Sequence, residues 1–229
     1  SGVSGGGDVR VGGGLYGRDP SIANAERVVM EAGASIDASA VRAGDGGQVV
    51  LWADEHTDFQ GAVRARGGAE SGDGGFVEVS GKQVLNFRGT VDAGADNGAG
   101  GTLLLDPKNI TVEALGGAAT SDVDQFADSP AADSVIAPTT ITAVTDTGTD
   151  VTLQANNDLT VSSAIVTNNA GGAGGDLTFQ AGRSISVNAN INSDDGNISF
   201  TVNDSGADGA NRDPGNASFT NTSLIDAGG

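Results

Sequence analysis

Short runs of alternating apolar and polar residues recur along the chain, and most of them follow a glycine-rich tetrad. The tetrad Gly-x-Gly-Gly occupies residues 44–47, 72–75, 98–101 and 172–175. The runs that follow it read QVVL, FVEV, TLLL and DLTF, and GGDVRV near the N-terminus has the same form. Alternation with a period of two is typical of strands that bury one face. The pattern predicts an all-β chain of short strands separated by tight turns.

Other apolar positions repeat in phase with the tetrads, the first three of which are separated by 28 and 26 residues. At equal distances from the last glycine of their tetrads lie Phe59 and Phe87, and likewise Val63 and Val91. If Thr149 takes the place of a tetrad glycine, Val161 matches Val187 and Ile165 matches Ile191 in the same way. The phrase Ile-Asp-Ala also recurs, at 36–38 and 225–227. A repeat of this length predicts a β-solenoid, in which each coil lays its strands on those of the coil before.

The alternation also predicts which side chains fill the interior of the solenoid. We expect inward stacks at Val49, Leu51, Phe59, Val63, Val77, Val79, Phe87 and Val91, and outward side chains at Gln60, Arg64, Glu78 and Asp92. Stacking in register would place Asp54 over Lys82 and Arg64 between Asp37 and Asp92, which predicts ion pairs between coils. The glycines are expected at corners, where a tight reversal often needs a positive φ.

The repeat divides the chain into three segments. The repeat is present in residues 1–117 and 148–229 and absent from residues 118–147. Pro130 and Pro138 interrupt regular structure there, so we expect an irregular excursion or linker with a short helical turn near 122–127. Smaller insertions at 17–27 and 205–216 predict loops on one edge of the solenoid, where such proteins often carry binding specificity.

Composition and charge narrow the classes of partner. The 229 residues include 38 glycines and no cysteine, and only 4% are aromatic, which suits a narrow core with tight corners. A formal net charge of −19 disfavours nucleic acid and anionic membranes as partners. No apolar run approaches the ~20 residues of a membrane span, so we expect no membrane insertion. No charged-then-apolar signal segment opens the sequence, so we expect a mature or internal fragment.

The repeats resemble those of a known family. GDGGQVVLWADEHTDFQGAVRARGG, GDGGFVEVSGKQVLNFRGTVDA and GTLLLDPKNITV are similar to the repeat region of filamentous-haemagglutinin-like large exoproteins, the passengers of two-partner (type Vb) secretion in Gram-negative bacteria. The resemblance covers most of residues 5–205 and is most specific from Gly44 to Val112. The family's N-terminal secretion domain is not apparent in these residues.

The resemblance implies a right-handed parallel β-helix and export through an outer-membrane secretion partner. It also implies a non-enzymatic adhesin, secreted or displayed at the cell surface, that acts in adhesion or biofilm formation. A solenoid has an unpaired strand edge at each end. We therefore expect partners that stack end to end, either flanking repeats of a longer fibre or copies of this chain, and possible contact with a surface glycan or matrix.

Catalytic chemistry is weakly supported by the residues. His56 is the sole histidine and has no serine or cysteine partner at an evident spacing, so no nucleophilic triad is expected. Carboxylates are plentiful, but none is visibly paired as polysaccharide-cleaving enzymes require. We expect no catalytic residues and no enzyme. A carbohydrate-binding or carbohydrate-cleaving β-helix that acts through side-face loops stays open as the alternative.

Two kinds of binding residue are candidates. Acidic turns at 192–197 and 203–213 offer oxygen ligands for structural calcium through Asp194, Asp195, Asp204, Asp208 and Asp213, although such residues are also common in metal-free turns. Trp52 alternates outward beside Asp54 and Glu55, where it either stacks on a glycan or packs under a neighbouring loop. Tyr16, in the loop GGGLYGRDP, has the same two interpretations.

Overall fold

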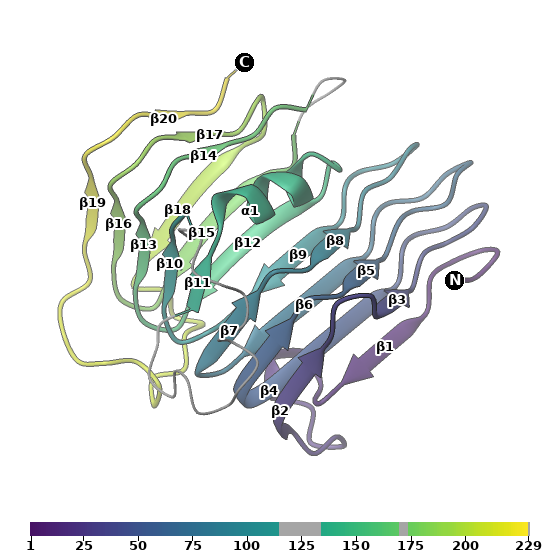
Figure 1. The fold of residues 1–229 in the computed structure, drawn as a ribbon, viewed down its shortest axis with the longest axis horizontal. Helices are drawn as coiled ribbons and strands as arrows, with labels where there is room; N and C mark the ends of the chain where they lie inside the picture. The colour runs from purple at the N-terminus through teal and green to yellow at the C-terminus, as the bar shows by residue number, and fades with distance from the viewer. Residues whose placement is uncertain (115–133, 170–173, 229) are drawn as a thin grey trace.

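The computed structural model describes residues 1–114, 134–169 and 174–228. Its largest sheet consists of parallel strands that come from successive copies of the repeat (Figure 1). In spatial order the strands are β1 (Asp8–Val11), β4 (Gln48–Phe59), β6 (Phe76–Gly81), β9 (Thr102–Leu105), β12 (Asp150–Ala155), β15 (Leu177–Ala181) and β18 (Ile198–Val202). The second half of β4 also pairs with β2 (Ala25–Met30) and β7 (Val84–Phe87).

Shorter strands form three further parallel sheets. One contains β11 (Ser134–Ile136), β10 (Ile110–Val112), β13 (Leu159–Val161), β16 (Ile185–Val187) and β19 (Phe219–Asn221). The others contain β3 (Ser35–Asp37), β5 (Ala62–Arg64) and β8 (Thr90–Asp92), and β14 (Ile165–Val166), β17 (Ile191–Asn192) and β20 (Ile225–Asp226). The chain is therefore rich in β-structure built from parallel strands, as the alternation predicts.

The strand register confirms the repeat that the sequence predicts. Gln48 pairs with Phe76, Phe76 with Thr102, and Thr102 with Asp150. Thr149 therefore stands where Gly101 stands one strand earlier. The other predicted matches are also strand partners: Phe59 with Phe87, Val63 with Val91, Val161 with Val187, and Ile165 with Ile191. The two repeat blocks thus share one continuous sheet.

The interior is a stack of apolar side chains. All eight residues predicted to point inward are at most 2% exposed. Phe59 and Phe87 lie in neighbouring strands with ring centroids 5.1 Å apart and nearly parallel planes. Phe179 and Phe200 stack in the same way at 4.9 Å. At these two places the strand register sets phenylalanine beside phenylalanine, so the two rings of each pair stack.

The glycine tetrads serve two purposes, of which the sequence indicated one. The first glycine of a tetrad adopts a positive φ at Gly44 and Gly72, with values of 94° and 123°. The later glycines are required instead by close approach of the neighbouring backbone. A Cβ on Gly74 would lie 1.7 Å from the carbonyl oxygen of Ala93 and 2.3 Å from the amide nitrogen of Gly101. At Gly74 the corners therefore stack too closely for a side chain.

Gly74→Ala is expected to lower the free energy of unfolding by about 1–3 kcal/mol, because backbone atoms must move to admit the methyl group. Gly7→Ala is the matched control, since a Cβ there meets nothing within 4 Å. Urea denaturation of both variants measures the difference. Equal stabilities would contradict the close approach of neighbouring corners.

The segment expected to be irregular contains regular structure where it is described. β11 pairs with β10, and α1 (Pro138–Thr145) follows. Pro138 begins this helix, in the first turn where proline is tolerated. Ile141 and Val144 are buried, and α1 packs between β8 and β14 and against β12 (Figure 1). The prediction of irregular structure was therefore wrong for residues 134–145, whereas the helical turn predicted near 122–127 lies outside the described residues.

The predicted ion pairs between coils have mixed outcomes. Arg64 lies between Asp37 and Asp92 in the strand register, as predicted, and its guanidinium is 4.0 Å from the Asp92 carboxylate. Lys82 does not pair with Asp54. Its Nζ lies 3.4 Å from Asp208, because the loop that carries Asp208 folds back over the sheet. Lys82 therefore forms its ion pair with a residue far along the chain and not with Asp54 on the adjacent strand.

Candidate functional site

A pocket of about 420 Å³ opens on the outer face of the largest sheet, between two loops. Its floor contains residues that alternate with the core residues Leu105, Leu153 and Phe179 and therefore point away from the interior. Its lining consists of Tyr16, Gly17, Arg18, Asn24, Trp52, Asp54, Lys82, Asp106, Gln154, Ala155, Asn156, Gln180, Gly182, Asp204, Gly206, Ala207 and Asp208. The side chains are mostly polar, with two aromatic residues and charges of both signs.

Parallel register arranges the floor of the pocket as a row across the sheet. Leu105 pairs with Leu153, so Asp106 stands beside Gln154, and Gln154 pairs with Gln180. The Gln154 side-chain amide donates to the Gln180 side-chain oxygen at 2.8 Å. Residues that are 26 or more positions apart in the sequence are thereby aligned. The row can present hydrogen-bond donors and acceptors to one ligand.

The first wall is the loop around the short 3₁₀ helix η1 (Leu15–Gly17). Tyr16 has a positive φ of 55°, and its backbone N–H donates to both carboxylate oxygens of Glu78, at 3.0 and 3.3 Å. Arg18 lies over the Tyr16 ring, 5.8 Å from its centroid. Glu78, fully buried beneath this loop, therefore anchors the wall that presents Tyr16 and Arg18.

Trp52 supports the same wall from below and is 4% exposed. Its indole packs so closely under the loop that a Cβ on Gly17 would lie 2.3 Å from the ring. Its Nε1–H donates to Asp54 at 3.2 Å, and the Asn24 side chain donates to the same oxygen at 3.0 Å. The prediction that Trp52 packs under a neighbouring loop is confirmed, and its ring offers a ligand little free surface.

The second wall is the loop from Asn203 to Asp213, which crosses back toward the N-terminal strands. Arg18 donates to the carbonyl of Gly206 at 3.4 Å, and the Asp208 N–H donates to the Asn156 side chain at 2.6 Å. The Asn211 side chain donates to the Lys82 carbonyl at 3.2 Å. The two loops thus contact each other and the sheet, which closes the pocket on two sides.

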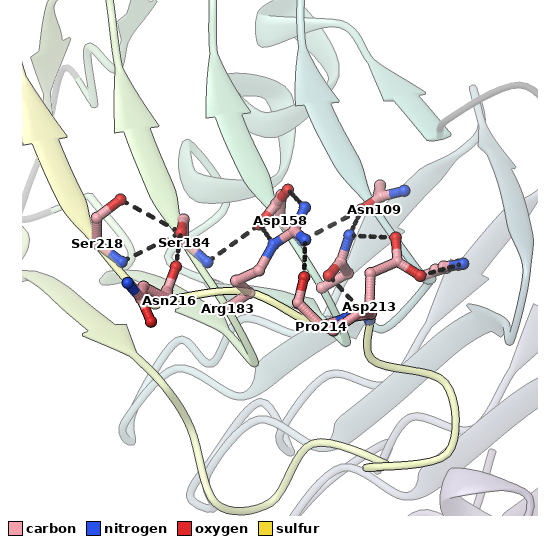
Figure 2. Close-up of polar contacts among 10 residues, drawn as sticks. Asn109, Asp158, Arg183, Ser184, Asp213, Pro214, Asn216 and Ser218 are labelled. Carbon is pink, nitrogen blue, oxygen red and sulfur yellow. Dashed lines mark hydrogen bonds and ion pairs between the residues drawn. The ribbon is translucent and has the colours of Figure 1, made fainter.

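Figure 2 shows how the far end of this second loop is held. Arg183 binds Asp158 with two hydrogen bonds and donates to the carbonyl of Pro214 at 3.1 Å. Asp213 accepts from the Asn157 side chain at 3.1 Å and forms an ion pair with Lys108, also at 3.1 Å. These contacts fix the far end of the loop, and the Asp204 N–H, which donates to the Ala181 carbonyl at 3.0 Å, fixes the near end.

Two buried carboxyl groups distinguish this face of the sheet. Asp106 lines the pocket and is 8% exposed, and its side chain makes no hydrogen bond or ion pair with any other described residue, although the charge of Arg18 acts on it from a distance. Burial, together with the negative charge of Glu78, raises the pKa of Asp106 to about 7. Burial likewise raises the pKa of Glu78 to about 7, against the opposing effect of the Tyr16 N–H. Carboxyls with strongly raised pKa values are typical of functional sites.

The pocket is lined by residues for which the sequence predicted two different ligands. Tyr16 and Trp52 were glycan candidates, and Asp204 and Asp208 were calcium candidates, yet all four line it. Asp213 instead binds Lys108, and Asp194 lies in the turn after β17, where it accepts from the Asn169 N–H at 2.6 Å and precedes Asp195. In the described parts of the chain, no three acidic or histidine side chains converge to hold a metal ion.

Sequence reasoning missed Glu78 and Asp106. Glu78 was predicted to point outward, and it does lie on the outer face, but the loop around Tyr16 covers that face and buries the side chain. A signal was present: the strand partners of Glu78 are Val50 and Leu104, which are apolar on a face expected to be polar. Burial of His56 lowers its pKa, and no acid–base role follows from its position.

The comparisons with known proteins identify no relative of this chain. A scan of protein-family models and a search of curated proteins find no match to this chain. Among the described residues, no helix is both long and apolar enough to cross a membrane.

Proposed function

We propose that this chain is a coil-forming segment of a right-handed parallel β-helix in a secreted or cell-surface adhesin of the filamentous-haemagglutinin-like type. The observation that carries the proposal is the unbroken parallel register of the largest sheet from β1 to β18. Stacked strands with an apolar interior make a rigid element, and rigidity is what a stalk or filament needs. The repeat motifs supply the family resemblance, and with it export through an outer-membrane partner.

The ends of the sheets support end-to-end association. Within the described residues, β1 and β18 each pair on one side only. Phe219 and Leu224, near the β18 end, are 44% and 61% exposed. Unpaired parallel edges and exposed apolar side chains favour stacking of further coils. Flanking repeats or copies of this chain would complete these edges, and calcium at the acidic turns is a further proposed aid.

Negative-stain electron microscopy, with and without millimolar calcium, tests this end-to-end association. We expect short particles that align end to end, growing into unbranched filaments if copies of this chain complete the edges. Leu224→Arg should block such growth, because it places a charge on the exposed end, whereas Val166→Arg on the side face should not. Lateral sheets of particles, or growth unaffected by Leu224→Arg, would contradict the proposal.

Adhesion is tested by displaying the chain on beads and measuring retention on glycan-coated and matrix-coated surfaces. Beads that carry an unrelated β-sheet domain of similar net charge are the control. We expect greater retention of beads that carry this chain. Equal retention would argue for a purely structural segment.

The alternative, a carbohydrate-binding or carbohydrate-cleaving β-helix, is favoured by one specific observation. The pocket on the outer face of the sheet lies between two loops and contains both glycan candidates, Tyr16 and Trp52, together with four aspartates. Polar pockets with aromatic side chains on a rigid scaffold suit small polar ligands. This second function is compatible with the first, because a β-helical stalk can carry a binding site on its side.

A further inference from the structure

Asp106 differs from the other acidic residues of the pocket in having no partner. Asp54 accepts from Trp52 and Asn24, Asp208 binds Lys82, and Asp204 accepts from the Gly206 N–H at 2.8 Å. The Asp106 side chain, more than nine-tenths buried, has no hydrogen bond or ion pair to the rest of the described chain, and only the more distant charge of Arg18 favours its ionised form. The Asp106 oxygens are not among the fully enclosed unsatisfied atoms of the described chain, so they reach the pocket space. Because buried polar side chains are almost always satisfied, a carboxyl that faces a cavity without a protein partner points to a ligand there.

The surroundings of Asp106 restrict the ligand class. Gln154 and Gln180 continue the row across the floor, and each side-chain amide combines donor and acceptor groups. The aspartates disfavour a phosphate or sulfate, and Arg18 and Lys82 offset part of their negative charge, so the pocket is not a simple cation site. A neutral ligand with many hydroxyl groups matches this mixture, because each hydroxyl both donates and accepts.

Shape and apolar surface agree with that class. A volume of about 420 Å³ lies within the usual range for small-ligand pockets. Tyr16 keeps 37% of its surface exposed at the rim, where it offers apolar contact to the C–H groups of a sugar ring. The site therefore combines a polar floor with one aromatic contact.

We propose that this pocket binds a neutral saccharide and that Asp106 is the contact that determines its specificity. This inference rests on the second function proposed above and assigns its ligand class and principal residue. The carboxyl of Asp106 pairs with saccharide hydroxyls, while Gln154 and Gln180 bind neighbouring hydroxyls along the row. Glu78 acts indirectly, as a positioning residue that holds the Tyr16 loop.

The first test is an array of neutral, sulfated, sialylated and amino-sugar oligosaccharides, probed with the intact chain. We expect retention on neutral saccharides, and titration calorimetry then gives the affinity for the strongest of them. Asp106→Ala should weaken that affinity at least about tenfold, and Gln180→Ala should weaken it less. Asp8→Ala, an exposed aspartate on β1 outside the pocket, should leave it unchanged.

Stability separates a binding role from a structural one. Since Asp106 is buried without a partner, Asp106→Ala should fold at least as stably as the parent chain at pH 8 while losing binding. A loss of both would assign Asp106 to the scaffold and overturn the proposal. Unchanged binding in Asp106→Ala would overturn the role of Asp106 as the specificity contact, although carbohydrate binding by the pocket would remain supported.

The saccharide array also tests the proposed ligand class. Retention only on charged saccharides would overturn the ligand class, and no retention at all would overturn the pocket as a saccharide site. Neither result bears on the structural function, which end-to-end association in the electron microscope tests separately.

Discussion

Phe87→Ala is expected to lower the free energy of unfolding by about 3–5 kcal/mol, the range typical of a buried phenylalanine truncated to alanine. Phe87 is 1% exposed and stacks on Phe59 across the strand pair. The truncation removes the ring and leaves a cavity between Phe59 and the next coil. A core built from successive stacks relaxes little, because strand register holds each backbone in place.

Chemical denaturation at neutral pH measures this effect, and Phe219→Ala is the matched control. Phe219 also contacts another phenylalanine, with its ring centroid 5.1 Å from that of Phe200, but it is 44% exposed. We expect Phe219→Ala to lose less than about 1 kcal/mol. Similar losses in the two variants would show that burial between coils is not the main source of stability.

Glu78→Gln is expected to stabilise the protein by about 3 kcal/mol at pH 8 and to have little effect near pH 4. Burial raises the pKa of Glu78 in the folded protein from 4.5 to about 7. Below about 4.5 the group is protonated in both the folded and unfolded states. Between 4.5 and 7 the unfolded chain loses the proton first, so folding stability falls as the pH rises, by about 1.4 kcal/mol per unit.

Glutamine keeps an oxygen for the Tyr16 N–H but carries no charge, so the variant should lose this pH dependence while the loop stays anchored. The measurement is the difference in unfolding free energy between Glu78→Gln and the parent chain from pH 4 to pH 8. Comparing the two proteins cancels the opposite contributions of Asp19, Asp37, Asp158 and Asp208, whose pKa values are lowered. Glu31→Gln, at an exposed position, should show no such difference. A pH-independent difference for Glu78→Gln would mean that Glu78 is solvated.

Local pattern was sufficient for the parts of the fold that depend on short-range chemistry. Alternation identified the inward residues, and the spacing of Phe59 to Phe87 and of Val161 to Val187 matched the observed strand partners. Even Thr149 was correctly placed in the position of a glycine. These features are readable because side chains alternate with a period of two and a stacked repeat brings equivalent positions together.

The site required contacts that no local pattern encodes. Asp208 meets Lys82, and Arg18 meets Gly206, across separations of more than 120 residues. The alternation that places Glu78 outward is correct for an open sheet, but it does not report that the loop around Tyr16 covers that face. The predicted pairing of Asp54 with Lys82 failed because the loop that carries Asp208 folds back over the sheet and binds Lys82.

The sequence by itself therefore determined the parallel β-rich architecture, its register and the composition of its interior, because these follow from periodicity and from glycine's lack of a side chain. Only the tertiary structure decided that loops from the two ends of the chain enclose a pocket, that Trp52 is covered and that Asp106 is buried without a partner. Loop packing depends on contacts between distant segments, and burial, which sets the pKa of a carboxyl, is a property of the folded whole.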